Sequence, residues 1–203
     1  MADHAVRNPG RPREFSADDV LESAVDLFWE KGFRATTTRD LEAQLGIAQS
    51  SIYNAFGSKR DLLLAAIDRY EHRVEGELLG ILAGPGDGIV VLDQFFAELG
   101  RWIARTDHRG CLVVNLMTAE TEDEAIRSRV VAYRDKIRGA LLAPLGRTFA
   151  PDVAATRADL LLAAVLGLHV TVPTSQPGEV ANMLAGVRAE LGTWALARSR
   201  ERA

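Results

Sequence analysis

Apolar residues recur at helical spacing along almost the whole of this chain of 203 residues. Side chains three and four positions apart lie on the same face of a helix, so this pattern marks a buried stripe. A clear example is the stripe formed by Leu92, Phe95, Phe96, Leu99, Trp102 and Ile103. Sustained alternation of apolar and polar residues, which would indicate half-buried strands, is hard to find. The sequence therefore predicts an all-α fold of about nine helices.

Three short helices are expected in the first third of the chain. Ser16 is placed to cap a first helix that ends at Gly32. A second helix should end at Gly46, where a left-handed terminal residue is needed, and residues 49–56 offer a third helix of about two turns. Two short helices joined by a tight turn containing glycine form a helix-turn-helix. We expect this N-terminal domain to span residues 15–57.

A long helix should connect this domain to the rest of the chain. Ser58 and Asp61 repeat the cap signature, and the apolar spacing predicts a single helix of roughly 37 Å over residues 58–82. Residues 83–203 then form a larger helical domain for ligand binding and dimerisation. Residues 1–14, which precede the first helix, are expected to form a flexible basic arm.

The larger domain should contain helices at about residues 89–105, 111–119, 122–142, 152–172 and 177–200. Thr121 with Glu124 forms a capping box for the third of them. The last two are so apolar that we expect them to form a two-by-two helix bundle with a second copy of the chain. The residues expected at that dimer interface are Leu161, Val165, Leu168, Val187, Leu191 and Trp194.

The charge balance argues against indiscriminate binding of polyanions, because the formal net charge is -4. Any contact with DNA must therefore rest on local clusters of positive charge. Cys111 is the only cysteine, which excludes an intramolecular disulfide and a four-thiolate zinc site and fits a reducing cytoplasm. The polar segment 1–13 is not a signal peptide, and the apolar stretch 160–172 is too short to cross a bilayer. We expect no membrane association, metal or cofactor.

The third predicted helix carries the side chains that base recognition requires. In a helix-turn-helix, the second of the two helices lies in the major groove, and its N-terminal residues meet base edges. The polar positions there can all form hydrogen bonds, and none is acidic: Gln49, Ser50, Ser51, Tyr53 and Asn54. Asn and Gln pair with adenine through two hydrogen bonds, and a tyrosine hydroxyl commonly reaches a phosphate. The alternative is a solvated polar helix face.

Positive charge flanks this helix on both sides and favours DNA contact over the solvated face. The first cluster consists of Lys31, Arg34 and Arg39, and the second of Lys59 and Arg60. The second cluster lies at the start of a helix, where backbone amides also attract a phosphate. The arm adds Arg7, Arg11 and Arg13. These arginines either reach a minor groove or belong to a disordered tail, and both alternatives stay open.

Residues 15–70 contain several short motifs at strict spacing, which makes a chance resemblance to a known family implausible. The motifs are the Gly32 and Phe33 pair, the run 36–40, the Leu45, Gly46 and Ile47 turn, and the signature of Ile52, Tyr53, Phe56 and Lys59. In these motifs the segment resembles the DNA-binding domain of the TetR/AcrR family of one-component transcriptional regulators. One departure is Ala48, where the family often has a hydroxyl side chain that caps the recognition helix.

The resemblance implies a role for each polar residue of the motif. Tyr53 and Lys59 would contact phosphates, and Thr38 would meet the DNA backbone at the start of the second helix. The side chains near the bases would be Gln49, Ser50, Ser51 and Asn54. The rest of the chain resembles the family only in its helix count, in its apolar final helix pair and in the pattern of Gly110, Cys111, Leu112 and Asn115.

A ligand cavity is expected among the helices of the larger domain, with Phe95, Trp102, Asn115 and Tyr133 as candidate lining. The aromatic stripe is more often plain core than pocket. Cys111 falls at a predicted helix start close to His108 and Arg109, an environment that lowers a thiol pKa and allows redox chemistry. A small buried residue is the favoured alternative at this position. His169, which lies among leucines, is expected to be an ordinary buried histidine.

These observations predict a regulator rather than an enzyme, because no nucleophile with a base, metal set or pair of convergent carboxylates is visible. The expected function is sequence-specific binding to a double-stranded DNA operator as a homodimer, as a repressor that a small-molecule effector releases. The alternative is a ligand-independent, architectural DNA-binding protein. A sensor requires a cavity of several hundred Å³ in the larger domain, roughly the size of known ligand pockets, whereas an architectural protein should be packed solid.

Overall fold

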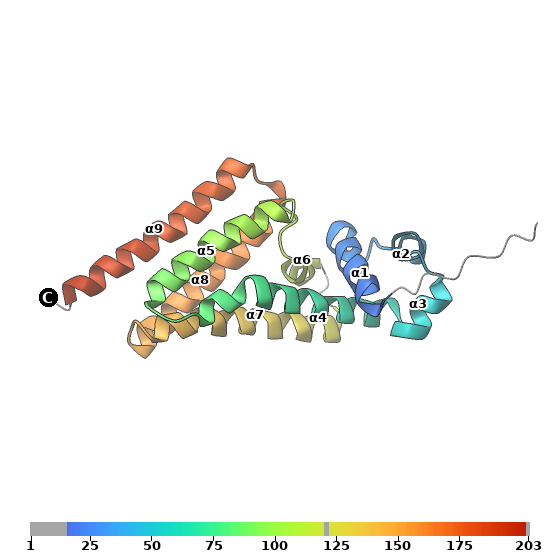
Figure 1. Cartoon of the computed structure of the whole chain (residues 1–203), viewed down its shortest axis with the longest axis horizontal. Coiled ribbons are helices and arrows are strands. Elements are labelled where there is room, and N and C mark those ends of the chain that lie inside the picture. The colour runs from blue at the N-terminus through green and yellow to red at the C-terminus, as the bar shows by residue number, and fades with distance from the viewer. Residues whose placement is uncertain (1–15, 120–121, 202–203) are drawn as a thin grey trace, which may run out of the picture.

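The computed structural model describes residues 16–119 and 122–201 of the chain. These residues form nine α-helices and two short 3-10 helices without a strand, which confirms the predicted all-α fold (Figure 1). The expected basic arm and Thr121 lie outside the described residues. The elements are α1 (Ala17–Lys31), α2 (Thr38–Leu45), α3 (Gln49–Phe56), α4 (Lys59–Glu77), η1 (Leu79–Ala83), α5 (Gly88–Arg105), α6 (Leu112–Ala119), α7 (Glu124–Gly146), α8 (Pro151–Thr171), η2 (Val172–Thr174) and α9 (Pro177–Glu201).

Helices α1, α2 and α3 gather at one end of the molecule (Figure 1). Ser16 caps α1 by accepting a hydrogen bond from the Asp19 N–H, and Thr37 and Asp40 form a capping box at α2. Gly46 ends α2 with φ 67° and ψ 17°, the left-handed conformation that glycine adopts without strain. The buried interior of this unit includes Phe28, Leu41, Leu45 and Ile52. The α2–α3 pair is thus joined by a short turn, as a helix-turn-helix requires.

Helix α4 leads from this unit into the larger bundle, but it is shorter than predicted. It ends at Glu77, and its 19 residues span about 28 Å. Leu78 leaves the α-helical conformation with φ -132°, and η1 follows. Glycines near this point weaken the α-helix. The tighter coil of η1 places Leu79 and Leu82, which are three positions apart, on one buried side. The prediction of a single helix over residues 58–82 is therefore wrong at its C-terminal end.

Helix α7 begins two residues later than predicted and extends further. Its N-cap is Asp123, whose Oδ1 accepts hydrogen bonds from the N–H groups of Ala125 at 3.0 Å and Ile126 at 3.1 Å. An aspartate is a strong N-cap residue, and Asp123 takes the place of the predicted cap Thr121. The helix continues past the predicted end at residue 142 and includes Pro144. A proline is tolerated there, without a sharp break in the helix, because it lies near the C-terminal end.

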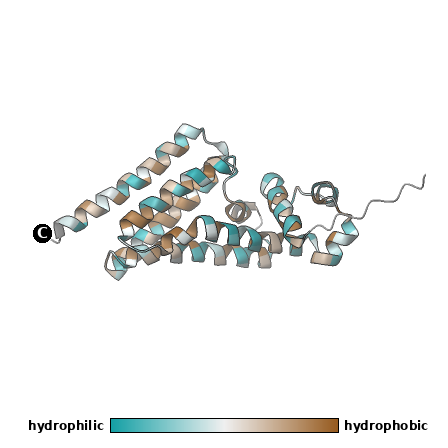
Figure 2. Ribbon diagram, in the orientation of Figure 1, coloured by the Kyte–Doolittle hydropathy of each residue, from teal (hydrophilic) through white to brown (hydrophobic). Residues whose placement is uncertain are grey.

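The larger bundle is built from two helix pairs. Helix α7 packs along α8, and α5 packs along α9. Apolar residues are concentrated in α5 and α8 (Figure 2). Phe95 and Phe96 of α5 are both buried, and their rings meet edge to face with centroids 5.1 Å apart. The core of the bundle therefore lies between α5 and its neighbours, and η1 closes it on the side of α4.

The residues expected at the dimer interface are mostly buried within the chain's own core. Leu161, Val165 and Leu168 of α8 are buried, and so are Leu191 and Trp194 of α9. Of the expected set, only Val187 is partly buried. Helix α8 is apolar nearly all round, so the sequence could not distinguish the face toward its own subunit from the face toward a partner. Leu161, Val165, Leu191 and Trp194 therefore face the chain's own core, whereas Leu168 and Val187 also line an open groove between α8 and α9.

One segment is long and apolar enough to cross a membrane by length and composition alone. It is the run Pro151–Thr174, which comprises α8 and η2 and has a mean hydropathy of 1.6 over its most apolar window. The core helix of a globular bundle has the same properties, and α8 packs against α6, α7 and α9. The segment is therefore weak evidence for a membrane span.

Candidate DNA-binding surface and ligand cavity

Helix α3 presents a polar face to solvent and an apolar face to the core. The side chains of Gln49, Ser50, Ser51 and Asn54 are exposed, whereas Ile52 is buried. Residues on a helix that are three or four positions apart share a face. The exposed side chains are therefore available for contact, and the buried Ile52 lies on the face where α3 packs against α2 and α4. The four exposed side chains are the ones that the sequence predicted for base contacts.

A residue outside α3 stabilises the start of the helix. Ala48 occupies the N-cap position and offers no side-chain hydrogen bond. Instead, the backbone N–H of Gln49 donates to Oε1 of Glu42 on α2 at 2.8 Å. One of the free N–H groups of the first turn is thus satisfied by a carboxylate, which also suits the positive end of the helix dipole. The sequence did not reveal this cap because Glu42 lies seven residues before Gln49.

Tyr53 and Thr38 join α3 to α2. Their hydroxyl oxygens are 3.3 Å apart, and either one can donate the hydrogen bond. Both side chains are only partly buried, so their hydroxyls lie at the edge of the exposed face. The two residues that the family resemblance assigns to the DNA backbone are therefore neighbours in the structure.

Lys59, at the start of α4, contacts the segment between α1 and α2. Its ammonium donates to the backbone carbonyl of Thr36 at 2.5 Å and lies 4.6 Å from the centroid of the Phe33 ring. Thr36 is itself buried, and its hydroxyl donates to the carbonyl of Gly32 at 2.7 Å. Lys59 thus ties the segment before α2 to the start of α4. This structural role is one that the sequence did not indicate.

Carboxylates accompany much of the positive charge around α3. The Lys31 ammonium binds Asp40 at 2.6 Å, and Arg34 and Arg60 pair with Glu122 and Asp123 at 3.4 Å and 2.9 Å. The hydrogen bond from Lys31, followed by those from Thr37, holds the pKa of Asp40 well below its usual range. The Arg34–Glu122 pair links the helix-turn-helix unit, and the Arg60–Asp123 pair links the start of α4, to the segment that precedes α7.

The loop between α5 and α6 contacts α1 through Arg109. The Trp29 indole N–H donates to the Arg109 carbonyl at 3.1 Å, and the Arg109 guanidinium lies 4.6 Å from the Trp29 ring centroid. The same guanidinium pairs with Asp26 at 3.4 Å. Asp107 and His108, with φ of 58° and 57°, adopt the left-handed conformation just before it. We call the contact of Arg109 with Trp29 and Asp26 the Arg109 junction.

The expected ligand cavity is almost filled in this structure. A void of only about 10 Å³ lies between α4, η1, α5, α7 and α8, enough for a single water at most. Three of the four candidate residues line it, namely Phe95, Trp102 and Tyr133. Asn115 is absent from its lining and instead donates to the Arg109 carbonyl at 3.2 Å. The described structure therefore lacks the expected cavity of several hundred Å³ at this place.

Two buried polar groups lie at or beside this void. His169 lines it, and its Nδ1 is buried without a hydrogen-bond partner among the described residues. Burial lowers the pKa of His169 to about 4, so the imidazole is neutral at neutral pH. Cys111 donates to the Tyr133 hydroxyl at 3.7 Å, and burial raises the pKa of its thiol. This shift is opposite to the lowered pKa that a reactive thiolate requires.

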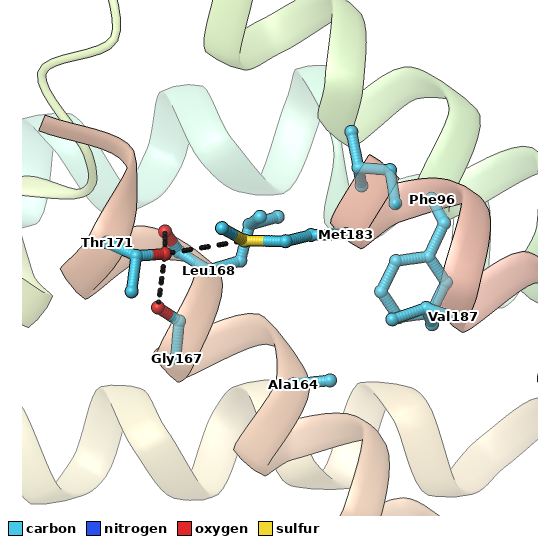
Figure 3. A pocket seen from close by; sticks show the side chains of 8 residues that line it. Phe96, Ala164, Gly167, Leu168, Thr171, Met183 and Val187 are labelled. Atoms are coloured by element: carbon cyan, nitrogen blue, oxygen red, sulfur yellow. Dashed lines mark hydrogen bonds between the residues drawn. The ribbon is translucent and has the colours of Figure 1, made fainter. Parts of the chain in front are cut away.

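A larger apolar groove opens between α8 and α9 (Figure 3). Its volume is about 350 Å³, and its lining consists of Phe96, Ala164, Gly167, Leu168, Thr171, Met183, Leu184 and Val187. The Thr171 hydroxyl, the main polar group in it, donates to the carbonyl of Gly167 at 3.0 Å. Between Val180 and Leu191, no residue of α9 is buried. This side of the molecule therefore leaves an apolar surface uncovered.

Comparison with known proteins shows that this chain is similar to bacterial transcriptional regulators. The family model described as "Bacterial regulatory proteins, tetR family" matches residues 20–66. The uncharacterised HTH-type transcriptional regulator YezE of Bacillus subtilis is 36% identical over 89 residues, which cover 44% of this chain and 46% of YezE. The HTH-type transcriptional repressor ComR of Escherichia coli is 29% identical over 119 residues, 58% of this chain and 57% of ComR. The chain spans about half the length of the curated relatives it matches.

Solved structures share the whole fold. The TetR family regulator CifR, in complex with 26-base-pair operator DNA, is 27% identical with a TM-score of 0.76 and covers 90% of this chain and 98% of its own. SCO4454 of Streptomyces coelicolor has a TM-score of 0.77 at 18% identity, covering 86% and 87%, which supports the fold alone. The family and these relatives are regulators rather than enzymes. From the helix-turn-helix, the bundle behind it and these matches, we conclude that residues 20–66 form a DNA-binding domain of the TetR family of bacterial regulatory proteins and that the chain as a whole is similar to solved TetR family regulators.

Proposed function

We propose that this protein is a cytoplasmic transcriptional repressor that binds operator DNA as a homodimer and is released by a small-molecule effector. The observation that carries the DNA-binding part is the exposed, hydrogen-bonding face of α3, held in place by Ile52, Glu42 and Tyr53. A rigid helix with such a face is what major-groove recognition requires. The complex of CifR with operator DNA and the repressor name of ComR support the same function.

The residues divide into two kinds of DNA contact. Gln49, Ser50, Ser51 and Asn54 would meet base edges, whereas Thr38, Tyr53 and Lys59 would contact the sugar-phosphate backbone. The support for this division is that the first set is exposed on α3 and that Thr38 and Tyr53 meet through their hydroxyls at the edge of that face. Lys59 is the first residue of α4, where the backbone N–H groups of a helix start also favour a phosphate.

A second copy of the chain would cover the groove between α8 and α9. The apolar lining of that groove and the exposure of α9 between Val180 and Leu191 support this interface. Leu160 and Val170 of α8 add exposed apolar side chains. A two-fold dimer buries the same patch on both copies, and it also sets two recognition helices on successive turns of the major groove. The dimer thus accounts for an otherwise costly surface.

Effector release is supported by the position of the small void in the core. The void touches α4, which leads to the helix-turn-helix. His169, which lines the void, also lies against the turn next to the Arg109 junction, since a Cβ at Gly110 would lie 2.6 Å from the His169 carbonyl oxygen. A change here would reach α1 through a few contacts. The tight packing of the void favours the second candidate function, a ligand-independent DNA-binding protein.

The DNA-binding proposal can be tested with fragments selected from the source genome by the purified protein. Tyr53→Phe should weaken binding to all fragments, whereas Gln49→Ala and Asn54→Ala should relax the preference at particular base pairs by about 1 to 3 kcal/mol each. Arg101→Gln, on an exposed face of α5, serves as the control. Fluorescence anisotropy with specific and scrambled duplexes distinguishes these results. Equal affinity of the unmodified protein for both duplexes would contradict sequence-specific recognition.

A further inference from the structure

We propose that the effector is an uncharged, mainly apolar molecule with one hydrogen-bonding group, such as a hydroxyl, and that this group binds Nδ1 of His169. The proposal rests on the proposed function for its biological meaning, because it names the ligand class of the same sensor. It begins from His169, which is 5% exposed and faces a void that is otherwise lined by carbon-rich side chains. An unpartnered polar atom in such a place is unfavourable until a ligand pairs with it.

The walls of the void provide aromatic and aliphatic contacts. Tyr70 of α4, Phe95 and Trp102 of α5 and Tyr133 of α7 surround it on different sides. Aromatic side chains contribute large buried areas to a ligand complex and little conformational entropy cost. Tyr70 and Tyr133 keep their protons, because burial raises the pKa of both phenols. The lining therefore selects for an apolar body and contributes no ionised group.

The charges around the void exclude a charged ligand. A ligand anion would need a cation, but the residues that line the void include no lysine or arginine, and burial keeps the His169 imidazole neutral at neutral pH. A ligand cation would need a carboxylate, but the residues that line the void include no aspartate or glutamate. Transfer of an uncompensated charge into such a site costs several kcal/mol or more. A neutral molecule escapes this cost.

Space for the ligand must come from movement of one wall, and the wall at the end of α4 is the one that can yield. Leu78 and Leu79 line the void where the α-helix breaks and η1 begins. The hydrogen bonds of a 3-10 helix have poorer geometry than those of an α-helix, so such a segment rearranges at lower cost. The other walls belong to the regular helices α5, α7 and α8. Ligand entry would therefore change the end of α4, which is the element that leads to the helix-turn-helix.

The experiment uses four probes of similar shape on the full-length protein: phenol, toluene, benzoate and phenyltrimethylammonium. Binding is measured by thermal shift and by isothermal titration calorimetry. We expect phenol to bind about tenfold or more tightly than toluene, because only phenol pairs with His169, and we expect no binding of the two ions. Equal binding of toluene and phenol, tighter binding of either ion, or no binding of phenol at millimolar concentration would each overturn the proposal.

Two substitutions locate the hydrogen bond. His169→Leu should abolish the preference for phenol over toluene, and His169→Gln should keep part of it. The control is His72→Leu on α4, because His72 is exposed and away from the void. Circular dichroism checks that each variant folds. If His169→Leu fails to fold, the four-probe comparison on the unmodified protein and on His169→Gln still decides the outcome.

Operator binding separates this proposal from the proposed function. Phenol that binds through His169 but leaves operator affinity unchanged would overturn effector release and leave the ligand class standing. A charged compound that binds at His169 and releases the operator would overturn the ligand class and leave effector release standing. Measurements of ligand binding and of operator affinity therefore test the ligand class and effector release independently.

Discussion

Glu42 is a single side chain on which the start of the recognition helix depends. It supplies α3 with the acceptor that Ala48 lacks, and it does so from the neighbouring helix α2. The contact therefore also fixes the angle between the two helices of the helix-turn-helix. A residue of this kind contributes to DNA binding without touching DNA, because the polar face of α3 is useful only when its orientation is fixed.

We predict that Glu42→Ala destabilises the protein by about 1 kcal/mol and weakens operator binding. The cause is an unsatisfied N–H at Gln49 and a looser start of α3. Glu42→Gln keeps an acceptor oxygen and should retain most of the stability. Urea unfolding and anisotropy measure the two effects. An Ala variant as stable as the unmodified protein would show that the 2.8 Å contact is not a working cap.

A second prediction at this scale concerns pH. The folded-state pKa of His169 is about 4, below the ordinary value of 6.5. Between these values the unfolded chain binds a proton at His169 that the folded protein does not, so the free energy of unfolding falls as pH drops through this range. The contribution is up to about 1.4 kcal/mol per pH unit. Chemical denaturation from pH 7 to 4.5 should give a shallower dependence for His169→Leu. Parallel curves for the two proteins would contradict a buried neutral imidazole.

The sequence revealed which residues of α3 are polar, but not what holds them. Gln49, Asn54 and Tyr53 could be chosen because their chemistry follows from residue type and helical spacing. Glu42 and the carbonyl that binds Lys59 are contacts across separate elements, and no local pattern encodes them. His169 was expected to be an ordinary buried histidine, because a sequence cannot show whether a ring nitrogen finds a partner.

At the scale of elements, the break in α4 and the Arg109 junction together define how the two parts of the chain meet. A continuous helix over residues 58–82 would be one stiff lever, whereas α4 ends at Glu77 and η1 turns into the core. The Arg109 junction provides a second route from the bundle to α1. The element types and most boundaries could be predicted from periodicity and caps. The break could not, because the burial of Leu79 and Leu82 depends on tertiary packing.

The turn before α6 should tolerate no side chain at Gly110. Its φ is 74°, and an added Cβ would lie 2.6 Å from the His169 carbonyl oxygen. We predict that Gly110→Ala lowers the free energy of unfolding by about 1 to 3 kcal/mol. Gly139→Ala, at a helical position with nothing within 4 Å, should instead raise it by about 0.5 to 1 kcal/mol. Thermal and urea unfolding compare the two, and equal effects would contradict this close approach.

We predict that Trp29→Phe loosens the Arg109 junction while leaving the core intact. The substitution removes the indole N–H that donates to the Arg109 carbonyl but keeps an aromatic ring at the same buried position. Amide hydrogen exchange should become faster in the last turn of α1 and in residues 106–111, with little change in α7 and α8. Arg101→Gln is the control. If exchange is unchanged, the junction does not hold α1 to the bundle.

At the scale of the whole molecule, the uncovered groove between α8 and α9 is the feature that a single copy leaves unexplained. This groove, shown in Figure 3, is the dimer interface that we propose, and it includes Leu168 and Val187 from the set expected from the sequence. The fold class was predictable because helical periodicity survives in every segment. The dimer face was not, because both faces of α8 are apolar.

We predict that Met183→Asp converts the proposed dimer into monomers. The carboxylate would be buried without a partner in the apolar groove, a penalty that association cannot overcome. Sedimentation at micromolar concentration should show the change, and the salt dependence of operator binding should fall to about half because each monomer contacts half of the phosphates. Val90→Asp, an exposed apolar site outside the groove, is the control. A dimeric Met183→Asp variant would place the interface elsewhere.

The ion pairs of Arg34 with Glu122 and of Arg60 with Asp123 bear on how such a protein finds its operator in a genome. A phosphate must compete with a carboxylate for each of these arginines, so contact with random DNA yields less free energy than a bare basic patch would. In the proposed complex, the residence time on nonoperator DNA would be shortened accordingly, while the base contacts proposed for α3 at the operator would keep their full value. The acidic partners would thus favour rapid search over retention on random DNA.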